Sequence, residues 1–365
     1  MARTRYTATS SAASNSPNMT DVRTLDTSRL APWLRAHVPG ADGQISAEKF
    51  AGGQSNPTYL LSVDGQPRFV LRRKPDGVLL PSAHAIEREY RVTDALKDSA
   101  VPVARPLALC EDASVVGTPF FIMDYAQGRN FWDARLPDLT PPDRAAIYDE
   151  MNCVLAALHA IDPAQVGLTD YGKPGNYFAR QVARWTKQYR ATQTQQLDAM
   201  EQLIAWLPVN DPGLEASRIV HGDYRNDNMI FAATEPRIIA VLDWELSTLG
   251  HPLADLAQHL MAWRVPKEGY RGLSDADLPT LGISSEADYL QRYAERSGAG
   301  PIDPAHWRYA LAFAMFRNAA IRQGVYHRAI SGNASSEAAA IHGARAGEIA
   351  SLAWRIACGE EDAHL

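Results

Sequence analysis

The segment from His221 to Asn228 holds carboxylate, amide and guanidinium side chains at a spacing that suits phosphoryl transfer. It reads His-Gly-Asp-Tyr-Arg-Asn-Asp-Asn, and Asp243 follows fifteen residues after its last asparagine. Transfer of a phosphoryl group from ATP needs a carboxylate beside the attacking hydroxyl, oxygen ligands for Mg²⁺ and cations near the phosphates. We therefore predict Asp223 as the base, Asn228 and Asp243 as the metal ligands, and Arg225 as a cation near the γ-phosphate.

A predicted hairpin explains how these side chains converge. Residues 229–231 and 237–242 are short runs rich in β-branched residues, and residues 233–236 supply a turn between them. A His-Gly-Asp triplet alone is more often an ordinary capped turn than a site. The spaced asparagine and the second aspartate at a predicted strand end favour a site over that interpretation.

A second set of chemical side chains lies upstream. On the predicted strand ending near residue 74, a period of two puts Val70 and Arg72 on one face. On the predicted helix 86–96, Glu89 falls within the apolar stripe, where a carboxylate is costly unless it meets a cation. Either Glu89 pairs with Arg72 or it only reaches solvent at the edge of the stripe, and the residues alone favour neither alternative.

The His-Gly-Asp-x4-Asn pattern resembles the aminoglycoside phosphotransferase and choline kinase branch of the protein-kinase-like superfamily, with matching elements from about Phe50 to Asp255. The resemblance implies an α+β, protein-kinase-like fold of two lobes. The first lobe is rich in strands with one main helix, and the second is mostly helical with a small sheet at the catalytic loop. We expect a disordered tail over residues 1–27, a nucleotide-binding lobe over 28–126 and a catalytic lobe over 127–365.

The same resemblance assigns a set of nucleotide-binding residues, which are Gly52, Gly53, Val70, Arg72, Glu89, Asp124, Tyr125 and Ala126. The resemblance favours pairing of Arg72 with Glu89, and this pair would hold the α- and β-phosphates. The backbone of residues 124–126 would meet the adenine edge. Two features depart from the usual pattern: arginine stands where lysine is common, and the glycines do not match G-x-G-x-x-G. Asp255 and His221 are expected to support the catalytic loop rather than to react.

Four further segments resemble the kinase domain that some animal acyl-CoA dehydrogenases carry: residues 52–59, 69–75, 79–90 and Asp243-Trp-Glu. This implies a kinase that depends on ATP and Mg²⁺, with hydroxyacyl-CoA thioesters as the leading acceptor class. An aminoglycoside or choline-like alcohol is the alternative acceptor, and a nucleotide-binding pseudokinase or interaction scaffold is the alternative function. A protein kinase ranks last because no activation-loop segment follows Asp243.

Basic residues on predicted helices could meet an anionic acceptor, although a solvated helix face is the commoner role for each one alone. They are Arg180, Arg184, Lys187, Arg317, Arg322 and Arg328.

The elements that must position these residues follow from periodicity. We predict strand structure over residues 50–73, folded as an antiparallel hairpin with its turn at Asp64-Gly65, and two short strands within 115–125. Helices are predicted over residues 30–37, 86–96, 197–207, 306–330 and 335–357, with one more starting after Thr140-Pro141.

The amino-acid composition limits the classes of partner that the protein can bind. The 365 residues include 42 acidic and 36 basic ones, a net charge of −6 that argues against general nucleic-acid binding. The three cysteines form no paired motif, and no apolar run is long enough for a membrane span, so we expect a cytoplasmic protein. The oligomeric state stays open, as does whether the first residues are a tail, a targeting segment or a misassigned start.

Overall fold

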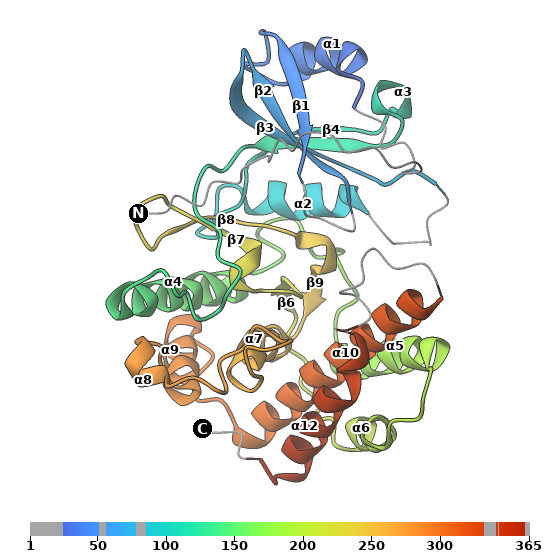
Figure 1. Cartoon of the computed structure of the whole chain (residues 1–365), viewed down its shortest axis with the longest axis vertical. Coiled ribbons are helices and arrows are strands. Elements are labelled where there is room, and N and C mark those ends of the chain that lie inside the picture. The colour runs from blue at the N-terminus through green and yellow to red at the C-terminus, as the bar shows by residue number, and fades with distance from the viewer. Residues whose placement is uncertain (1–24, 51–55, 78–84, 332–340, 342, 362–365) are drawn as a thin grey trace, which may run out of the picture. The chain divides into compact units, whose positions relative to one another are not determined.

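The computed structural model describes residues 25–50, 56–77, 85–331, 341 and 343–361, and the chain divides into two compact units (Figure 1). The first unit comprises the described residues up to Arg129 together with Ile230–Ala233 and Ile239–Glu245. The second comprises Asn130–Met229, Thr234–Ile238 and the residues from Leu246 onward. The expected tail lies almost wholly outside the described residues, since only residues 25–27 of it are described.

The first unit is built on one antiparallel sheet of five strands in the order β1-β2-β3-β5-β4 (Figure 1). Its elements are α1 (Thr27–His37), β1 (Ile45–Lys49), β2 (Thr58–Val63), β3 (Gln66–Arg73), α2 (Ile86–Leu96), β4 (Pro106–Cys110), α3 (Ala113–Val116) and β5 (Phe120–Asp124). Helix α1 packs on β1 and α3, whereas α2 packs on β4 and β5. The prediction of a strand-rich first part with one main helix is confirmed.

Successive side chains of β3 point alternately into the core of the first unit and to the opposite face of the sheet. Leu71 is fully buried in a cluster that also contains Leu30 and Leu34 of α1, together with Leu61 and Ile122 from the neighbouring strands. The intervening residues of β3 face the other way, because successive side chains of a strand point to opposite faces of the sheet.

The predicted turn of the β2–β3 hairpin is confirmed. Asp64 and Gly65 have φ values of 50° and 77°, which is the left-handed pair that a two-residue hairpin turn requires.

The prediction of the first of the two short strands within residues 115–125 is wrong. Residues 113–116 form the single-turn helix α3, whose first turn is capped by Asp112 accepting the Ser114 N–H. Gly117, at φ 92°, ends it by donating its N–H to the Ala113 carbonyl. Local capping therefore outweighs the β-propensity of Val115 and Val116. The second strand is present as β5.

The second unit is mostly helical. Its helices are α4 (Pro141–Ala160), α5 (Tyr177–Thr192), α6 (Asp198–Val209), α7 (Pro252–Leu260), α8 (Leu278–Leu281), α9 (Glu286–Ser297), α10 (Pro304–Ile330) and α12 (Ala346–Cys358). Helix α10 packs against α5, α7 and α12 (Figure 1). The helix predicted over 335–357 is present only from Ala346 onward as α12, and residues 332–340 and 342 lie outside the described residues.

Two small pairs of strands lie next to residues 221–228 in the chain. Strands β6 (Arg218–Val220) and β9 (Thr248–Gly250) pair antiparallel, and β7 (Met229–Phe231) pairs with β8 (Ile238–Val241). The predicted hairpin is therefore present. Among the described residues, no helix combines the length and the apolar character needed to cross a membrane.

Candidate active site

Arg72 of the first unit lies among three carboxylates. Its Nε lies 2.6 Å from Oε2 of Glu89, and its Nη2 lies 2.7 Å from Oδ1 of Asp243 and 3.8 Å from Oε2 of Glu245. The predicted contact between β3 and α2 is thus confirmed. Asp243, which follows β8, reaches the same guanidinium.

Burial and neighbouring negative charges have opposite effects on the pKa of Arg72. Its side chain is 12% exposed and that of Glu89 is 4% exposed. Burial alone would lower the pKa of Arg72, but the carboxylates of Glu89, Asp243 and Glu245 outweigh it and raise that pKa above its ordinary value. Arg72 therefore stays charged.

Asp243 has an unusual backbone conformation. Its φ is 63°, in the left-handed region that residues other than glycine seldom adopt. The side chain is 37% exposed although Arg72 holds it. Strained residues of this kind cluster at functional sites.

Sequence reasoning missed Glu245. Its carboxylate lies within 4.8 Å of those of Glu89 and Asp243. The Asp-Trp-Glu triplet is continuous in the sequence, but the short 3-10 helix η2 (Trp244–Leu246) that returns Glu245 toward Arg72 leaves no periodic signal.

The residues assigned to the adenine edge lie at the end of β5. The N–H groups of Asp124 and Tyr125 already donate to the carbonyls of Arg105 and Arg68. An adenine contact would therefore use the Ala126 N–H or carbonyl oxygens. Met123 and Ala126 pack on a small apolar cluster formed by Ala104, Ile230 and Ala240.

In the second unit, Asn228 and Gln258 hold the Asp223 carboxylate from two sides. Asn228, in the 3-10 helix η1 (Asn226–Asn228), donates its Nδ2 to Oδ2 of Asp223 at 3.1 Å and to the Asp223 carbonyl at 2.9 Å. Gln258 of α7 donates to Oδ1 at 3.4 Å. The amide nitrogen of Asn228 is thus used within the loop, and its Oδ1 is the atom suited to a hard cation such as Mg²⁺.

Hydrogen bonds from buried side chains hold this loop in place. Asp255 accepts the His221 N–H at 2.6 Å and the Gly222 N–H at 2.7 Å. The Nε2 of His159 lies 3.3 Å from the same carboxyl group, and Nδ1 of His221 accepts the Asp223 N–H at 3.1 Å. Desolvation would raise the pKa of Asp255, but its hydrogen bond with His159, with further help from His221, lowers it. The contacts expected of Asp255 and His221 are present.

Arg317 also contacts the loop. It is buried, with 6% of the residue exposed, and donates to the Gly222 carbonyl at 2.7 Å. The sequence placed Arg317 among residues that could meet an anionic acceptor. Its hydrogen bond shows a supporting contact, which helical periodicity alone could not reveal.

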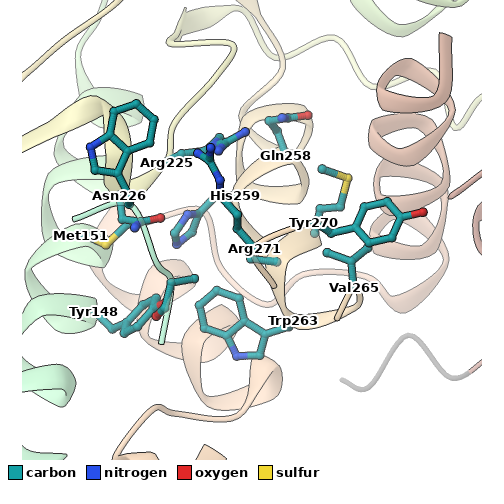
Figure 2. Close-up of a pocket in the computed structure, with 14 residues that line it drawn as sticks. Tyr148, Met151, Arg225, Asn226, Gln258, His259, Trp263, Val265, Tyr270 and Arg271 are labelled. Carbon is teal, nitrogen blue, oxygen red and sulfur yellow. The ribbon is translucent and has the colours of Figure 1, made fainter. Parts of the chain in front are cut away.

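A small pocket, partly open to solvent, lies beside the loop within the second unit (Figure 2). In that view Arg225 and Gln258 lie on one side and Tyr148 and Trp263 on the other. Arg225 pairs with Asp227 at 2.8 Å, and Arg271 lies 3.3 Å from the same carboxylate. Arg271 and Gln258 are further site residues that the sequence did not single out.

The predicted site residues thus fall into two groups. Arg72 contacts both Glu89 and Asp243 in the first unit, and Asp223, Asn228 and Arg225 belong to the second. Gly52 and Gly53 lie outside the described residues.

Known proteins share this arrangement of elements. A solved structure of a putative aminoglycoside phosphotransferase from Ralstonia eutropha is 48% identical, with a TM-score of 0.84 over 92% of this chain and 99% of that one. A choline kinase from Cryptosporidium parvum has the same fold at 12% identity, with a TM-score of 0.60 over 89% and 96% of the two chains. The predicted protein-kinase-like fold is confirmed.

The relatives by sequence are larger proteins. Acyl-CoA dehydrogenase family member 10 of Mus musculus is 47% identical over 320 residues, which are 87% of this chain but 30% of that protein. The probable acyl-CoA dehydrogenase IBR3 of Arabidopsis thaliana is 41% identical over 85% of this chain and 40% of its own length. The chain therefore spans less than half of these relatives, in agreement with the predicted resemblance to their kinase domain.

A family model covers most of the chain. Residues 46–300 match the model described as the phosphotransferase enzyme family. This range contains Arg72, Glu89, Asp223, Asn228 and Asp243. The chain belongs to the phosphotransferase enzyme family.

Proposed function

We propose that this protein transfers the γ-phosphate of ATP, in a reaction that depends on Mg²⁺, to a hydroxyl group of a small molecule. The observation that carries the proposal is the Asp223 carboxylate, held by Asn228 and Gln258 at a pocket that Gln258 also lines. A fixed carboxylate at a pocket can orient a hydroxyl and accept its proton.

In the proposed reaction the acceptor oxygen attacks the γ-phosphorus, and the bond from that phosphorus to the β,γ-bridging oxygen breaks. ADP leaves, and the hydroxyl proton passes to Asp223. Oxygens of Asn228 and Asp243 would hold Mg²⁺, which offsets the charge of the phosphates. Arg225 would bring a further positive charge to the transferred group.

The remaining residues would bind the nucleotide. Arg72, held by Glu89, would contact the α- and β-phosphates when ATP enters. Val70 would meet the adenine ring, and the backbone of residues 124–126 its edge. Gly52 and Gly53 would bring backbone N–H groups to the phosphates.

For the acceptor we propose a hydroxyacyl-CoA thioester. The support is the similarity to proteins named acyl-CoA dehydrogenase family members 10 and 11. Aminoglycosides and choline-like alcohols are the competing acceptors. The cysteines Cys110, Cys153 and Cys358 are free thiols, which suits a reducing compartment such as the cytoplasm.

The decisive experiment is a screen of hydroxylated metabolites with γ-labelled ATP and Mg²⁺, followed by Asp223→Ala on the best acceptor. We expect Asp223→Ala to lower kcat by about 100-fold or more, as for loss of a general base. Asp42→Ala, which removes an exposed carboxylate, is the control and should keep full activity. Full activity in Asp223→Ala would remove Asp223 from the chemistry, and nucleotide binding without turnover of any acceptor would favour the pseudokinase.

A further inference from the structure

Aromatic and thioether side chains line much of the pocket beside the Asp223 loop (Figure 2). They include Trp132, Tyr148, Met151, Trp263 and Tyr270. No aspartate or glutamate is among the described residues that line this pocket. An ammonium group placed here would therefore meet ring faces and no carboxylate of the wall.

The polar atoms of the buried rings are engaged within the protein. The Tyr148 hydroxyl donates to the Ala134 carbonyl at 2.6 Å, and Nε1 of Trp263 donates to the Ser284 carbonyl at 3.0 Å. His259 also lines the pocket, and burial lowers its pKa to about 4, so its ring is uncharged at neutral pH. These side chains therefore offer a ligand the uncharged carbon surface of their rings.

The charged side chains of the wall are paired, and one polar side chain links the pocket to the proposed base. Arg225 and Arg271 both contact the Asp227 carboxylate, at 2.8 Å and 3.3 Å. Gln258 lines the pocket and donates to Oδ1 of Asp223 at 3.4 Å. A group bound in the pocket would thus lie close to the carboxylate that we propose as the acceptor of the hydroxyl proton.

Exposure to solvent differs between the residues of the wall. Met151 and Tyr148 are buried, with 1% and 4% of each residue exposed, whereas Trp132 is 54% exposed. Moving hydrocarbon from water onto a buried, uncharged wall is favourable in proportion to the area covered. The small size of the pocket limits this gain to a short group.

We propose that this pocket binds a short hydrocarbon segment of the acceptor, next to the hydroxyl that receives the phosphoryl group. The proposal rests on the proposed phosphotransfer at Asp223 and specifies its acceptor as an alcohol that carries an alkyl chain. Aminoglycosides would bring several ammonium groups to a wall without carboxylates, which is costly. Choline is the competing occupant, because aromatic faces also attract cations.

The test is an NMR titration of the full chain, isotope-labelled at its methionine methyl groups, with linear alcohols from ethanol to 1-hexanol. We expect the methyl signal of Met151 to move and the affinity to rise about fourfold for each added methylene until the pocket is filled. Met200 is buried in α6 of the same unit and is not among the lining residues, so its signal should stay in place. Choline and kanamycin, at the same concentrations, should leave the Met151 signal unchanged.

Two matched variants test the position of the alkyl chain. Met151→Ala enlarges the pocket, so the affinity should continue to rise to a longer alcohol than in the unchanged protein, as read from the methyl group of Met261, another lining residue. Met200→Ala also removes a fully buried methionine from a helix of the second unit and should leave the alcohol series unchanged. The two variants therefore share a loss of packing and differ only at the pocket.

The proposal is rejected if affinity does not depend on chain length, or if choline binds more tightly than 1-butanol. It is also rejected if the folded Met151→Ala protein and the unchanged protein reach their limit at the same alcohol. Should Met151→Ala not fold, the titration of the unchanged protein still decides. The titration needs neither nucleotide nor turnover, so its failure leaves the role of Asp223 standing, and full activity of Asp223→Ala would overturn that role without affecting the alcohol series.

Discussion

Two arginines of this chain show how local charge decides what a guanidinium can do. Arg72 has Glu89, Asp243 and Glu245 around it, so its charge is stabilised before any ligand arrives. Arg322 lies over the ring of Tyr270, and burial lowers its pKa below the ordinary value. Neighbouring carboxylates therefore decide the direction of the pKa shift at Arg72, whereas burial decides it at Arg322.

The ion pairs of Arg72 can be tested by comparing Arg72→Met with Arg72→Lys. Arg72→Met leaves three carboxylates without their cation and should lower the free energy of unfolding by about 3 kcal/mol, the low end for a buried pair because Asp243 is 37% exposed. Arg72→Lys keeps one charge but not the planar fork, so it should cost less stability while still raising the KM for ATP. Urea denaturation and ATP kinetics measure the two effects.

The matched control for this comparison is Arg105→Met. Arg105 pairs with Asp98 on the surface of the same unit, with 52% and 71% of the two side chains exposed. Its loss should change stability by at most about 1 kcal/mol. Equal losses for Arg72→Met and Arg105→Met would contradict the importance assigned to the buried cluster.

At the scale of elements, strongly periodic helices and strands could be predicted from the sequence, whereas short elements could not. Helix α2 followed from its apolar stripe, and the Arg72–Glu89 pair followed from the stripe and the strand alternation together with the family resemblance. Strand β1 carries only Ile45 as a buried residue, so its sequence shows little alternation. Strand β9 is three residues long and gains its partner from β6, about thirty residues earlier, a pairing that no local pattern can signal.

Among the residues of the candidate site, too, some could be predicted from the sequence and others could not. The loop residues Asp223 and Asn228 could be recognised because their spacing is local. Gln258, Arg271 and Arg317 reach the site through helix packing and tertiary contacts, so their sequence neighbourhoods resemble ordinary helix faces or loops. Tertiary contacts of this kind are beyond periodicity.

The turn that carries Asp223 depends on Gly222. Its φ is 85°, and a Cβ added there would lie 2.8 Å from the Leu246 carbonyl oxygen. Gly222→Ala should therefore lower the free energy of unfolding by about 2 kcal/mol or more, combining left-handed strain with the backbone clash. It should also lower kcat, because the adjacent Asp223 must shift. Chemical denaturation and steady-state kinetics are the measurements.

Gly298→Ala separates the clash from the strain. Gly298 ends α9 at φ 69°, and no atom lies within 4 Å of the position of an added Cβ. It should lose only about 1 kcal/mol, with unchanged kcat. If the two alanine variants lose the same stability and keep the same activity, close packing at Gly222 has no catalytic consequence.

For the whole molecule, the important feature is how chemistry is distributed between the units. The acidic cluster at Arg72 belongs to the first unit, whereas the Asp223 loop and the pocket belong to the second. The hairpin β7–β8 is shared, since Met229 and Ile238 belong to the second unit and Ile230 and Ile239 to the first.

The stability of the whole molecule should depend on pH through two buried histidines of the second unit. Burial lowers the pKa of His251 to about 4, with His159 and His306 lowering it further. Burial also lowers the pKa of His259 to about 4, although the backbone at Tyr224 and the charge of Asp255 oppose it.

In the unfolded chain both imidazoles titrate near 6.5, so between about pH 6.5 and 4 the unfolded state binds two protons that the folded state does not. Stability is then fully present above pH 6.5 and falls as the pH drops, by up to about 3 kcal/mol per histidine at pH 4. His251→Asn should remove one proton from this dependence, because asparagine keeps an acceptor for the Leu253 N–H at the start of α7 but does not titrate. Urea denaturation at pH 7, 6 and 5 should show a shallower fall in His251→Asn than in the unchanged protein, whereas His37→Asn, an exposed site of the first unit, should keep the original slope. Identical slopes in all three proteins would show that His251 binds its proton equally well in the folded and unfolded states.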